Sequence, residues 1–334
     1  MSTPQAVRSS AWQLNYQGKD ITKDILLMVE EITYTSKGDG ASSDLDIKIE
    51  DSGQLWQGPW YPTQGDVLTL WIGYSDAPLV ACGSFQIDQP ELEGPPDVMH
   101  IHCLTTDITP SLRTPNTIGY ENQTLPQIAQ TIATKHGLTV VGAPASLNVT
   151  FKRKTQRQET DIAFLHRLSN QYNYDFTIKA GQLIFRARTV VEQAAPILTI
   201  ARQNIMRFEF IDKSHGTYKA AQVNYFDPHA KALNTATAPA TAPNPTGDTL
   251  KIRGRAENGQ DAMARATAEI HKANMNSITA RITTPGNTNL AAGVTVTIQG
   301  FGVFSGKFLI HTAKHQIQRA SGYTTSMELR KIPD

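Results

Sequence analysis

Residues 156–185 read QRQETDIAFLHRLSNQYNYDFTIKAGQLIF, and this stretch decides the fold of the region around it. Near its start, apolar residues recur at steps of three and four, which is typical of one buried face of a helix: Ile162, Leu165, Leu168 and Tyr172. Thr160, or alternatively Thr155, can cap this helix, because a side-chain oxygen accepts one of the unpaired first-turn N–H groups.

After Asn173 the pattern changes to the two-residue period of a half-buried strand, in which Tyr174, Phe176 and Ile178 share one face. Gly181 can adopt the positive φ of a tight turn. The apolar residues 183–185 then begin a return strand. The stretch therefore predicts a helix followed by a β-hairpin.

This block resembles a region of contractile-phage tail hub proteins (the late control protein D family) and of the hub part of type VI secretion spike proteins. The residues that carry the resemblance are an acidic lead, a Phe-Leu-x-Arg-Leu helix and an aromatic hairpin: Glu159, Asp161, Phe164, Leu165, Arg167, Leu168, Tyr174 and Phe176. Near the C-terminus, residues 306–311, His315 and residues 321–330 resemble the closing hairpin of that family.

The resemblance implies a homotrimeric baseplate hub of a contractile phage or of a tailocin such as a pyocin. In such a hub each chain supplies two similar barrel domains around a channel. The ring would adapt the sixfold tail tube to the threefold spike, because a closed ring must present like docking surfaces to each neighbour. The implied partners are the spike below, the tube or tube initiator above, and the tape-measure and other baseplate proteins. The implied location is the tail of a virion or tailocin particle assembled in the bacterial host cytoplasm.

Composition suits a β-rich, turn-rich protein or one with large polar interfaces. The 334 residues are 40% hydrophobic and 18% charged, with a formal net charge of +1. This balance argues against a dedicated nucleic-acid binder and against readout of nucleic-acid sequence. The small basic cluster of residues 152–154 and Arg157 is interpreted as a solvated loop face. No apolar run reaches the length of a membrane span. Cys82 and Cys103 are expected to be buried, reduced residues in neighbouring strands.

The pattern along the chain predicts an α+β, mainly β fold in three parts. Residues 1–112 read as short strands separated by glycine-containing breaks and are assigned to a first antiparallel β-barrel hub domain. Residues 113–192 form an α+β middle domain, and residues 193–334 form a second barrel. No obvious sequence repeat relates the two barrels.

Two further helices and one loop are predicted. Thr124 and Gln127 form a capping box for a helix that Gly137 ends in the left-handed conformation. Asn258 is the expected N-cap of a helix over residues 259–274. Between them, residues 228–249 are rich in Pro, Ala and Thr and have little to bury, so they are predicted to be a mobile loop.

Candidate chemistry in the sequence is sparse. His100 and His102 would share one strand face and could make a two-ligand metal clip, and so could His311 and His315, but further ligands at a telling spacing are absent. Glu159 and Asp161 are explained by the helix start that they occupy. We therefore predict no enzyme, no cofactor, and no catalytic or metal residue, and the sequence leaves the interface residues unassigned.

Two alternative functions stay open from the sequence. One is a tail-associated cell-wall hydrolase. The other is a carbohydrate-binding tail protein, in which Trp56, Trp60 and Tyr61 would form a stacking platform.

Overall fold

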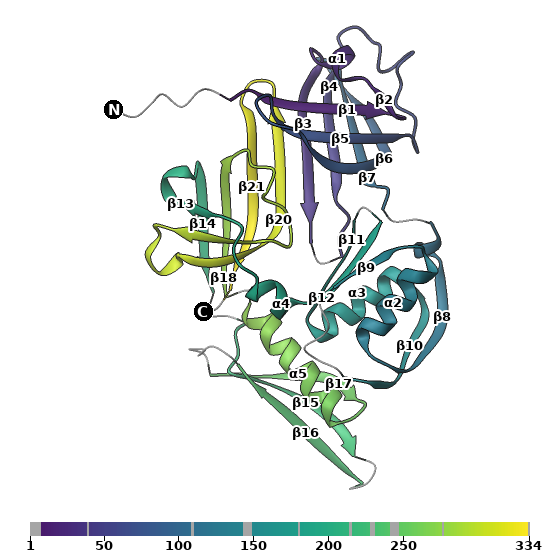
Figure 1. The fold of residues 1–334 in the computed structure, drawn as a ribbon, viewed down its shortest axis with the longest axis vertical. Coiled ribbons are helices and arrows are strands. Elements are labelled where there is room, and N and C mark those ends of the chain that lie inside the picture. Colours follow the sequence, from purple (N-terminus) through teal and green to yellow (C-terminus); the bar gives the residue numbers. More distant parts are fainter. Residues whose placement is uncertain are drawn as a thin grey trace.

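The computed structural model describes residues 8–38, 40–107, 110–142, 149–179, 181–213, 216–227, 231–240, 247–275 and 277–332. Figure 1 shows strand-rich N-terminal and C-terminal parts lying side by side, and a helix-containing part below them. The N-terminal part holds one helical turn and seven strands: α1 (Thr22–Ile25), β1 (Ser10–Tyr16), β2 (Lys19–Asp20), β3 (Val29–Lys37), β4 (Asp44–Glu50), β5 (Val67–Tyr74), β6 (Val80–Glu93) and β7 (Val98–Thr105).

The middle part packs helices against two small sheets. Its elements are η1 (Pro110–Arg113), β8 (Pro115–Gln123), α2 (Leu125–Lys135), β9 (Thr139–Val141), β10 (Phe151–Thr160), α3 (Asp161–Tyr172), β11 (Tyr174–Lys179), β12 (Gln182–Ala187) and α4 (Arg188–Gln193). The local predictions are confirmed here. Thr124 and Gln127 form the capping box of α2, and the Thr160 side chain accepts a hydrogen bond from the N–H of Ala163 at the start of α3. Strands β11 and β12 pair antiparallel up to Lys179 and Gln182.

The C-terminal part contains β13 (Thr199–Ala201), η2 (Arg202–Asn204), β14 (Arg207–Asp212), β18 (Ile278–Pro285), β19 (Thr295–Gln299), η3 (Gly302–Phe304), β20 (Gly306–Gln318) and β21 (Gly322–Lys331). Inserted between β14 and β18 is a separate unit of three strands and one helix: β15 (Ala220–Asp227), β16 (Ala232–Pro239), β17 (Thr249–Ala256) and α5 (Gly259–Asn274). Helix α5 has the predicted bounds, and the Asn258 side chain accepts a hydrogen bond from the N–H of Asp261.

The loop predicted for residues 228–249 is wrong in part, because β16 occupies Ala232–Pro239 and pairs with β15 along its length. The strand escapes detection because its buried side chains are small. Ala236 and Ala238 belong to a core that they share with Ala262 and Ala266 of α5, so close packing replaces large apolar groups. Residues 228–230 and 241–246 lie outside the described residues.

One sheet joins the N-terminal and C-terminal parts. Its strand order is β14-β18-β21-β20-β3-β4-β7-β6-β5-β1-β2, and β19 with β13 extends from β20. The joint lies between β20 and β3, which pair antiparallel from Thr312↔Lys37 to Gln318↔Glu31. The strands expected in two separate regions thus form a continuous hydrogen-bonded surface (Figure 1).

The two halves of this sheet repeat one connectivity. Across the N-terminal half the strands run β3, β4, β7, β6, β5, β1, and across the C-terminal half they run β14, β18, β21, β20, β19, β13. Numbered along the chain within each half, both orders are second, third, sixth, fifth, fourth, first. One detail differs, since β1 pairs antiparallel with β5 whereas β13 pairs parallel with β19.

A short shared sequence pattern accompanies this duplication, although no obvious repeat relates the two halves. Residues 83–87 read GSFQI and residues 306–310 read GKFLI, a shared Gly-x-Phe-x-Ile pattern in β6 and β20. Both glycines have positive φ, 124° at Gly83 and 135° at Gly306, a conformation that side chains disfavour. Directly after each pattern the strand bulges, between Ile87 and Gln89 and between Ile310 and Thr312.

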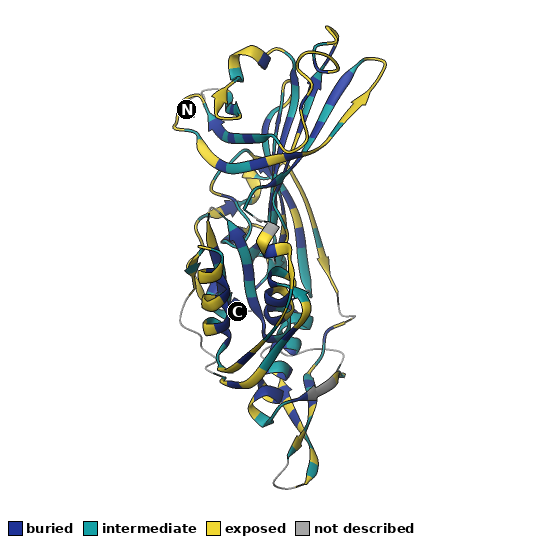
Figure 2. Ribbon diagram, turned by 90° about the vertical axis from the view of Figure 1, so that its right-hand side faces the viewer, coloured by how far each residue is buried: buried dark blue, intermediate teal, exposed yellow. Residues whose placement is uncertain are grey.

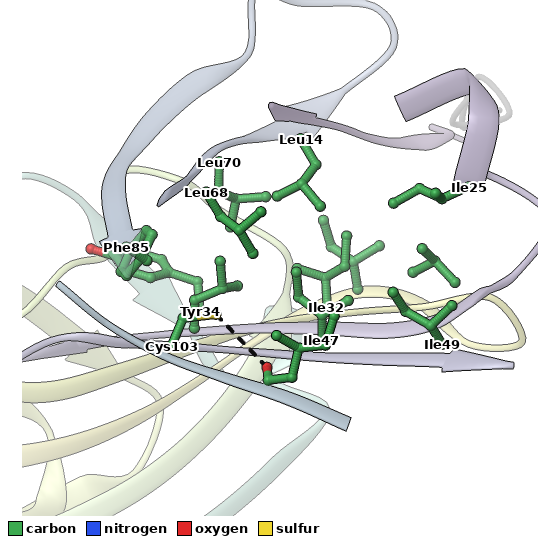
Figure 3. Close-up of a cluster of buried hydrophobic side chains, with 14 of the residues drawn as sticks. Leu14, Ile25, Ile32, Tyr34, Ile47, Ile49, Leu68, Leu70, Phe85 and Cys103 are labelled. Carbon is green, nitrogen blue, oxygen red and sulfur yellow. Dashed lines mark hydrogen bonds between the residues drawn. The ribbon is translucent and has the colours of Figure 1, made fainter. Parts of the chain in front are cut away.

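Each half has its own apolar core on the same side of the sheet. The N-terminal core (Figure 3) includes Leu14, Ile32, Leu45, Ile47, Leu68 and Phe85, all at most 2% exposed. The C-terminal core includes Ile282, Val296, Phe308 and Ile310, all at most 1% exposed. Burying each such side chain contributes roughly 1.5–3 kcal/mol, so each half is stabilised internally before the joint is counted.

Candidate functional site

The face of the sheet opposite the cores carries a continuous polar surface. Buried and exposed residues alternate along the long strands (Figure 2), because successive side chains of a strand point to opposite faces. We call this surface the polar face. It is formed in the N-terminal half by Glu31, Thr33, Thr35, Asp46, Lys48, Gln89, Glu91, His100 and His102, and in the C-terminal half by Glu209, Arg281, Thr283, Thr312, Lys314, Gln316, Ser326 and Glu328.

Two shallow grooves lie on the polar face. One, of about 460 Å³, is lined by charged side chains of the N-terminal half that include Glu31, Lys48 and Glu91. The other, of about 360 Å³, is lined in the C-terminal half by residues that include Glu209, Arg281 and Glu328. Both are open and lined mostly by charged or polar residues, which fits a water-covered wall better than a pocket for a small molecule.

Several charges on the polar face are compensated across neighbouring strands. Arg281 lies 3.4 Å from Glu209 on β14 and 3.4 Å from Glu328 on β21. At the joint, Gln316 and Gln318 of β20 donate hydrogen bonds of 2.6 and 2.9 Å to the Glu31 carboxylate of β3. Burial acts to raise the pKa of Glu31, but the hydrogen bonds from Gln318, Thr33 and Gln316 hold it below its usual value. The joint between the halves is therefore tied by side chains as well as by backbone.

His100 and His102 lie side by side on the polar face, as the strand period predicts. His102 Nδ1 is 2.6 Å from Asp46 Oδ1, and His100 Nε2 is 3.2 Å from Glu93 Oε2. Within the described ranges, no group of three or more His, Cys, Asp or Glu residues is placed to hold a metal ion. Each histidine is instead accounted for by one carboxylate partner.

His311 and His315 do not share a face, and that prediction is wrong. The bulge between Ile310 and Thr312 inserts His311 and reverses the alternation of β20. His315 consequently points into the protein, 3% exposed, where its Nδ1 is 2.8 Å from the Tyr323 hydroxyl and its Nε2 is 2.9 Å from the Leu290 carbonyl. Burial lowers the pKa of His315 to about 4.

The basic cluster at residues 152–154 lies in strand β10 and not in a loop, so that interpretation is wrong in part, although Lys152, Arg153 and Arg157 are exposed as expected. The Lys154 ammonium donates a 2.6 Å hydrogen bond to the Tyr172 hydroxyl, which in turn donates one of 2.6 Å to Asp261 Oδ1 of α5. The Lys154 side chain is 14% exposed and that of Asp261 is 2% exposed. This buried polar cluster holds the α5 unit against the middle part.

Asp161 lies where the helix start places it, but its contacts were not foreseen. Its carboxylate lies 2.6 Å from His136 Nε2, and His136 Nδ1 lies 3.0 Å from the Ser111 hydroxyl. A Ser–His–Asp series is used in hydrolases to stabilise the imidazolium that forms during catalysis. Here Lys135 already neutralises the same Asp161 oxygen at 2.8 Å, and Gln156 binds the other oxygen at 2.8 Å. We therefore assign the group a structural role, tying the end of α2 to the start of α3. Burial acts to raise the pKa of Asp161, but the hydrogen bonds from Lys135 and His136 lower it.

Both cysteines are free and buried, in the paired strands β6 and β7, as predicted. Burial raises the pKa of Cys82 and of Cys103 to about 12, so neither is a reactive thiolate at neutral pH.

The aromatic platform is only partly formed. Trp56 is buried at 6% exposure, whereas Trp60 and Tyr61 are 42% and 54% exposed. The rings of Trp56 and Trp60 meet edge to face at 5.9 Å. Together with Tyr16 and Pro59 they line a groove of about 340 Å³.

None of the helices in the described residues combines the length and the apolar character needed to cross a membrane.

Comparison with known proteins agrees with this architecture. A family model described as "Phage tail baseplate hub" matches residues 108–321, more than half of the chain. A "probable baseplate hub protein" of Escherichia phage 186 is 28% identical over 212 residues, covering 62% of this chain, and that of Escherichia phage P2 is 30% identical over the same length and coverage. In both cases the match spans 54% of the relative's own length.

Solved structures show the same fold along nearly the whole chain. The 43 kDa tail protein of prophage MuSo2 from Shewanella oneidensis is 16% identical, with a TM-score of 0.74 over 97% of this chain and 98% of that one. An Escherichia coli component of the type VI secretion system is 13% identical, with a TM-score of 0.59 over 96% of this chain and 77% of that one. From the family match, together with this fold, the chain belongs to the phage tail baseplate hub family.

Proposed function

We propose that this protein is the structural hub of a contractile-tail baseplate, where three copies form a ring that joins the hexameric tail tube to the trimeric spike. Residues 1–112 and 193–334 are the two barrel-type hub domains of the proposal, and residues 113–192 are the middle domain. The polar face lines the channel. The tail tube, the spike and the tape-measure protein are the proposed partners, in a phage or tailocin particle.

The observation that carries the proposal is the duplicated sheet. Two halves with the same strand connectivity stand edge to edge in one chain, so three chains supply six similar units. A sixfold tube requires six like docking positions, and a threefold spike requires three. A channel wall must also stay wetted and must not hold what passes through it. The polar face suits this need, because several of its charges, such as those of Arg281 and Asp46, are compensated between neighbouring strands.

The test is the mass of the purified protein in solution, measured by light scattering alone and with its spike protein. We expect a complex of three chains of 36.7 kDa each, either alone or in a three-to-three assembly with the spike. A chain that stays monomeric in both conditions would contradict the ring.

The aromatic groove beside Trp60 and Tyr61 favours carbohydrate binding as a second candidate function. Exposed aromatic faces stack on sugar rings, and two such faces border one groove here. We expect Trp60→Ala to abolish any glycan binding detected on an array, while Trp71→Ala serves as a control in strand β5. Glycan binding that survives Trp60→Ala would exclude this groove as its site.

A further inference from the structure

We propose that β14 of one chain pairs antiparallel with residues 89–93 of β6 in the next chain, in the register that β3 and β20 use within a chain. This pairing rests on the proposed ring, and it would be the contact between chains that closes the ring. Each open strand edge is therefore covered by a second copy of this chain.

The duplication sets the correspondence between strands. By position in the sheet, β14 corresponds to β3 and β20 corresponds to β6. The matching glycines, the Gly-x-Phe-x-Ile pattern and the bulges align β6 with β20 residue by residue, so that Ile87 corresponds to Ile310 and Gln89 to Thr312.

An aromatic pair fixes the second correspondence. Tyr34 of β3 meets Phe85 edge to face, with ring centroids 5.8 Å apart at 68°. Phe210 of β14 meets Phe308 with centroids 6.2 Å apart at 62°. Phe85 and Phe308 are the equivalent phenylalanines of the repeat, so Phe210 occupies the place of Tyr34.

Strand β20 uses one of its edges twice. Residues 306–309 pair with β19, and residues 312–318 pair with β3 on the same side. In β6, residues 80–86 pair correspondingly with β5, but along residues 88–93 no strand of the described chain pairs with that edge. The place that β3 fills in the C-terminal half is thus open in the N-terminal half.

The strand that corresponds to β3 is open as well. Among the described strands, β14 pairs only with β18. The N–H of Lys213 donates to Ser277 on the β18 side, so by the antiparallel alternation the backbone groups of Asp212, Phe210 and Phe208 point to the open edge. An unpaired edge of this kind is a template for another strand.

The register between chains follows when each residue of the β3–β20 pairing is replaced by its equivalent in β14 and β6. The pair His315↔Tyr34 then corresponds to Leu92↔Phe210, and the pair Thr312↔Lys37 corresponds to Gln89↔Lys213. Leu92 is 46% exposed and Phe208 is 44% exposed, large apolar side chains that the neighbouring chain would cover. Lys213 would lie diagonally from Glu91, within reach of a cross-strand ion pair.

Two features of the edge weaken this pairing without preventing it. Pro90 lacks an N–H and would stand opposite Asp212, so the ladder between chains would lack one backbone hydrogen bond. Glu93 would face Glu209, an unfavourable contact between like charges, but Arg281 lies 3.4 Å from Glu209 with its side chain 68% exposed and can bridge both carboxylates.

Each chain carries one β14 edge and one β6 edge, so the contact is heterologous and three copies can close a ring. The decisive experiment is disulfide trapping. We expect Leu92→Cys/Phe210→Cys to give a covalent trimer on a non-reducing gel after mild oxidation, with the spike protein added if it is needed for assembly. Directly opposed residues of an antiparallel pair lie about 4.5–5.5 Å apart between Cα atoms, within disulfide range.

Leu92→Cys/Phe208→Cys, displaced by two residues, is the register control and should crosslink far less. A trimer by light scattering that crosslinks only in the displaced variant, or in neither, would overturn the register and leave the ring standing. A monomer under all conditions would overturn both.

A substitution without cysteine gives an independent readout. We expect Phe208→Lys to raise the protein concentration needed for trimer formation at least tenfold. The circular dichroism spectrum of the folded chain should be unchanged. Phe226→Lys is the matched control, because Phe226 is 45% exposed and lies on β15, away from both edges. Equal assembly of the two variants would count against the proposed contact.

Discussion

Asp261→Ala is expected to lower the free energy of unfolding by about 3–5 kcal/mol, the usual cost of removing one partner of a buried charge pair. The change leaves the Lys154 ammonium buried without its carboxylate and removes the 2.6 Å acceptor of the Tyr172 hydroxyl. Burial already lowers the pKa of Lys154, and the negative charges of Asp261 and Glu257 oppose this shift. Urea unfolding at neutral pH measures the loss.

Two further variants separate the charge effect from a general disturbance of α5. Lys154→Met combined with Asp261→Ala should recover part of the stability, because the Lys154 ammonium is then no longer left without its carboxylate. Glu269→Ala, on the same helix and partly exposed, should change the free energy by less than about 0.5 kcal/mol. A loss below about 1 kcal/mol for Asp261→Ala would show that the cluster does not hold the α5 unit in place.

Acidification from pH 7 to pH 4 is expected to destabilise the protein by about 3 kcal/mol through His315 alone. The pKa of this imidazole is about 4 in the folded protein and 6.5 in the unfolded chain, a gap worth 1.36 kcal/mol for each pKa unit. Below pH 6.5 the imidazole of residue 315 is protonated in the unfolded chain but stays neutral in the folded protein. Stability therefore falls as the pH falls through 6.5, and this loss is complete near pH 4.

The measurement compares unfolding of the natural protein and of His315→Gln across this pH range. The variant has lower stability at pH 7, since the Tyr323 hydroxyl and the Leu290 carbonyl lose their partner. Its pH dependence between 6.5 and 4 should be shallower by about 3 kcal/mol, and His315→Phe should behave alike. Parallel pH curves for the natural protein and both variants would refute a neutral, buried His315.

Sequence patterns predicted the elements whose signals are local. The start of α5 at Asn258, the capping box of Thr124 and the hairpin around Gly181 depend on neighbouring residues, and all three are seen. The resemblance to the hub family is confirmed by the family match over residues 108–321, which includes residues 156–185 and the first strand of the closing hairpin.

What the sequence did not predict depends on residues far apart. The β20–β3 joint brings Gln316 to Glu31, and the α5 cluster brings Tyr172 to Asp261. Periodicity cannot reveal such pairings. The bulge in β20, a single inserted residue, was enough to turn His315 away from the strand face predicted to hold both His311 and His315, and into the core. The Gly-x-Phe-x-Ile pattern is present in the sequence. A five-residue pattern is too short to indicate a duplication until the strand order shows that β6 and β20 are equivalent.

The joint between β3 and β20 also has a consequence for the order of events during synthesis. Strand β3 leaves the ribosome long before its partner β20, because most of the described strands lie between them in the chain. Contacts so distant in sequence form slowly, because the intervening chain must first be ordered. Throughout translation the nascent N-terminal half therefore exposes the edge of β3, where another chain's C-terminal hairpin would fit as well as its own. On a polysome that makes several copies at once, correct folding requires that β3 of each chain pair with β20 of the same chain before it pairs with β20 of a neighbouring chain.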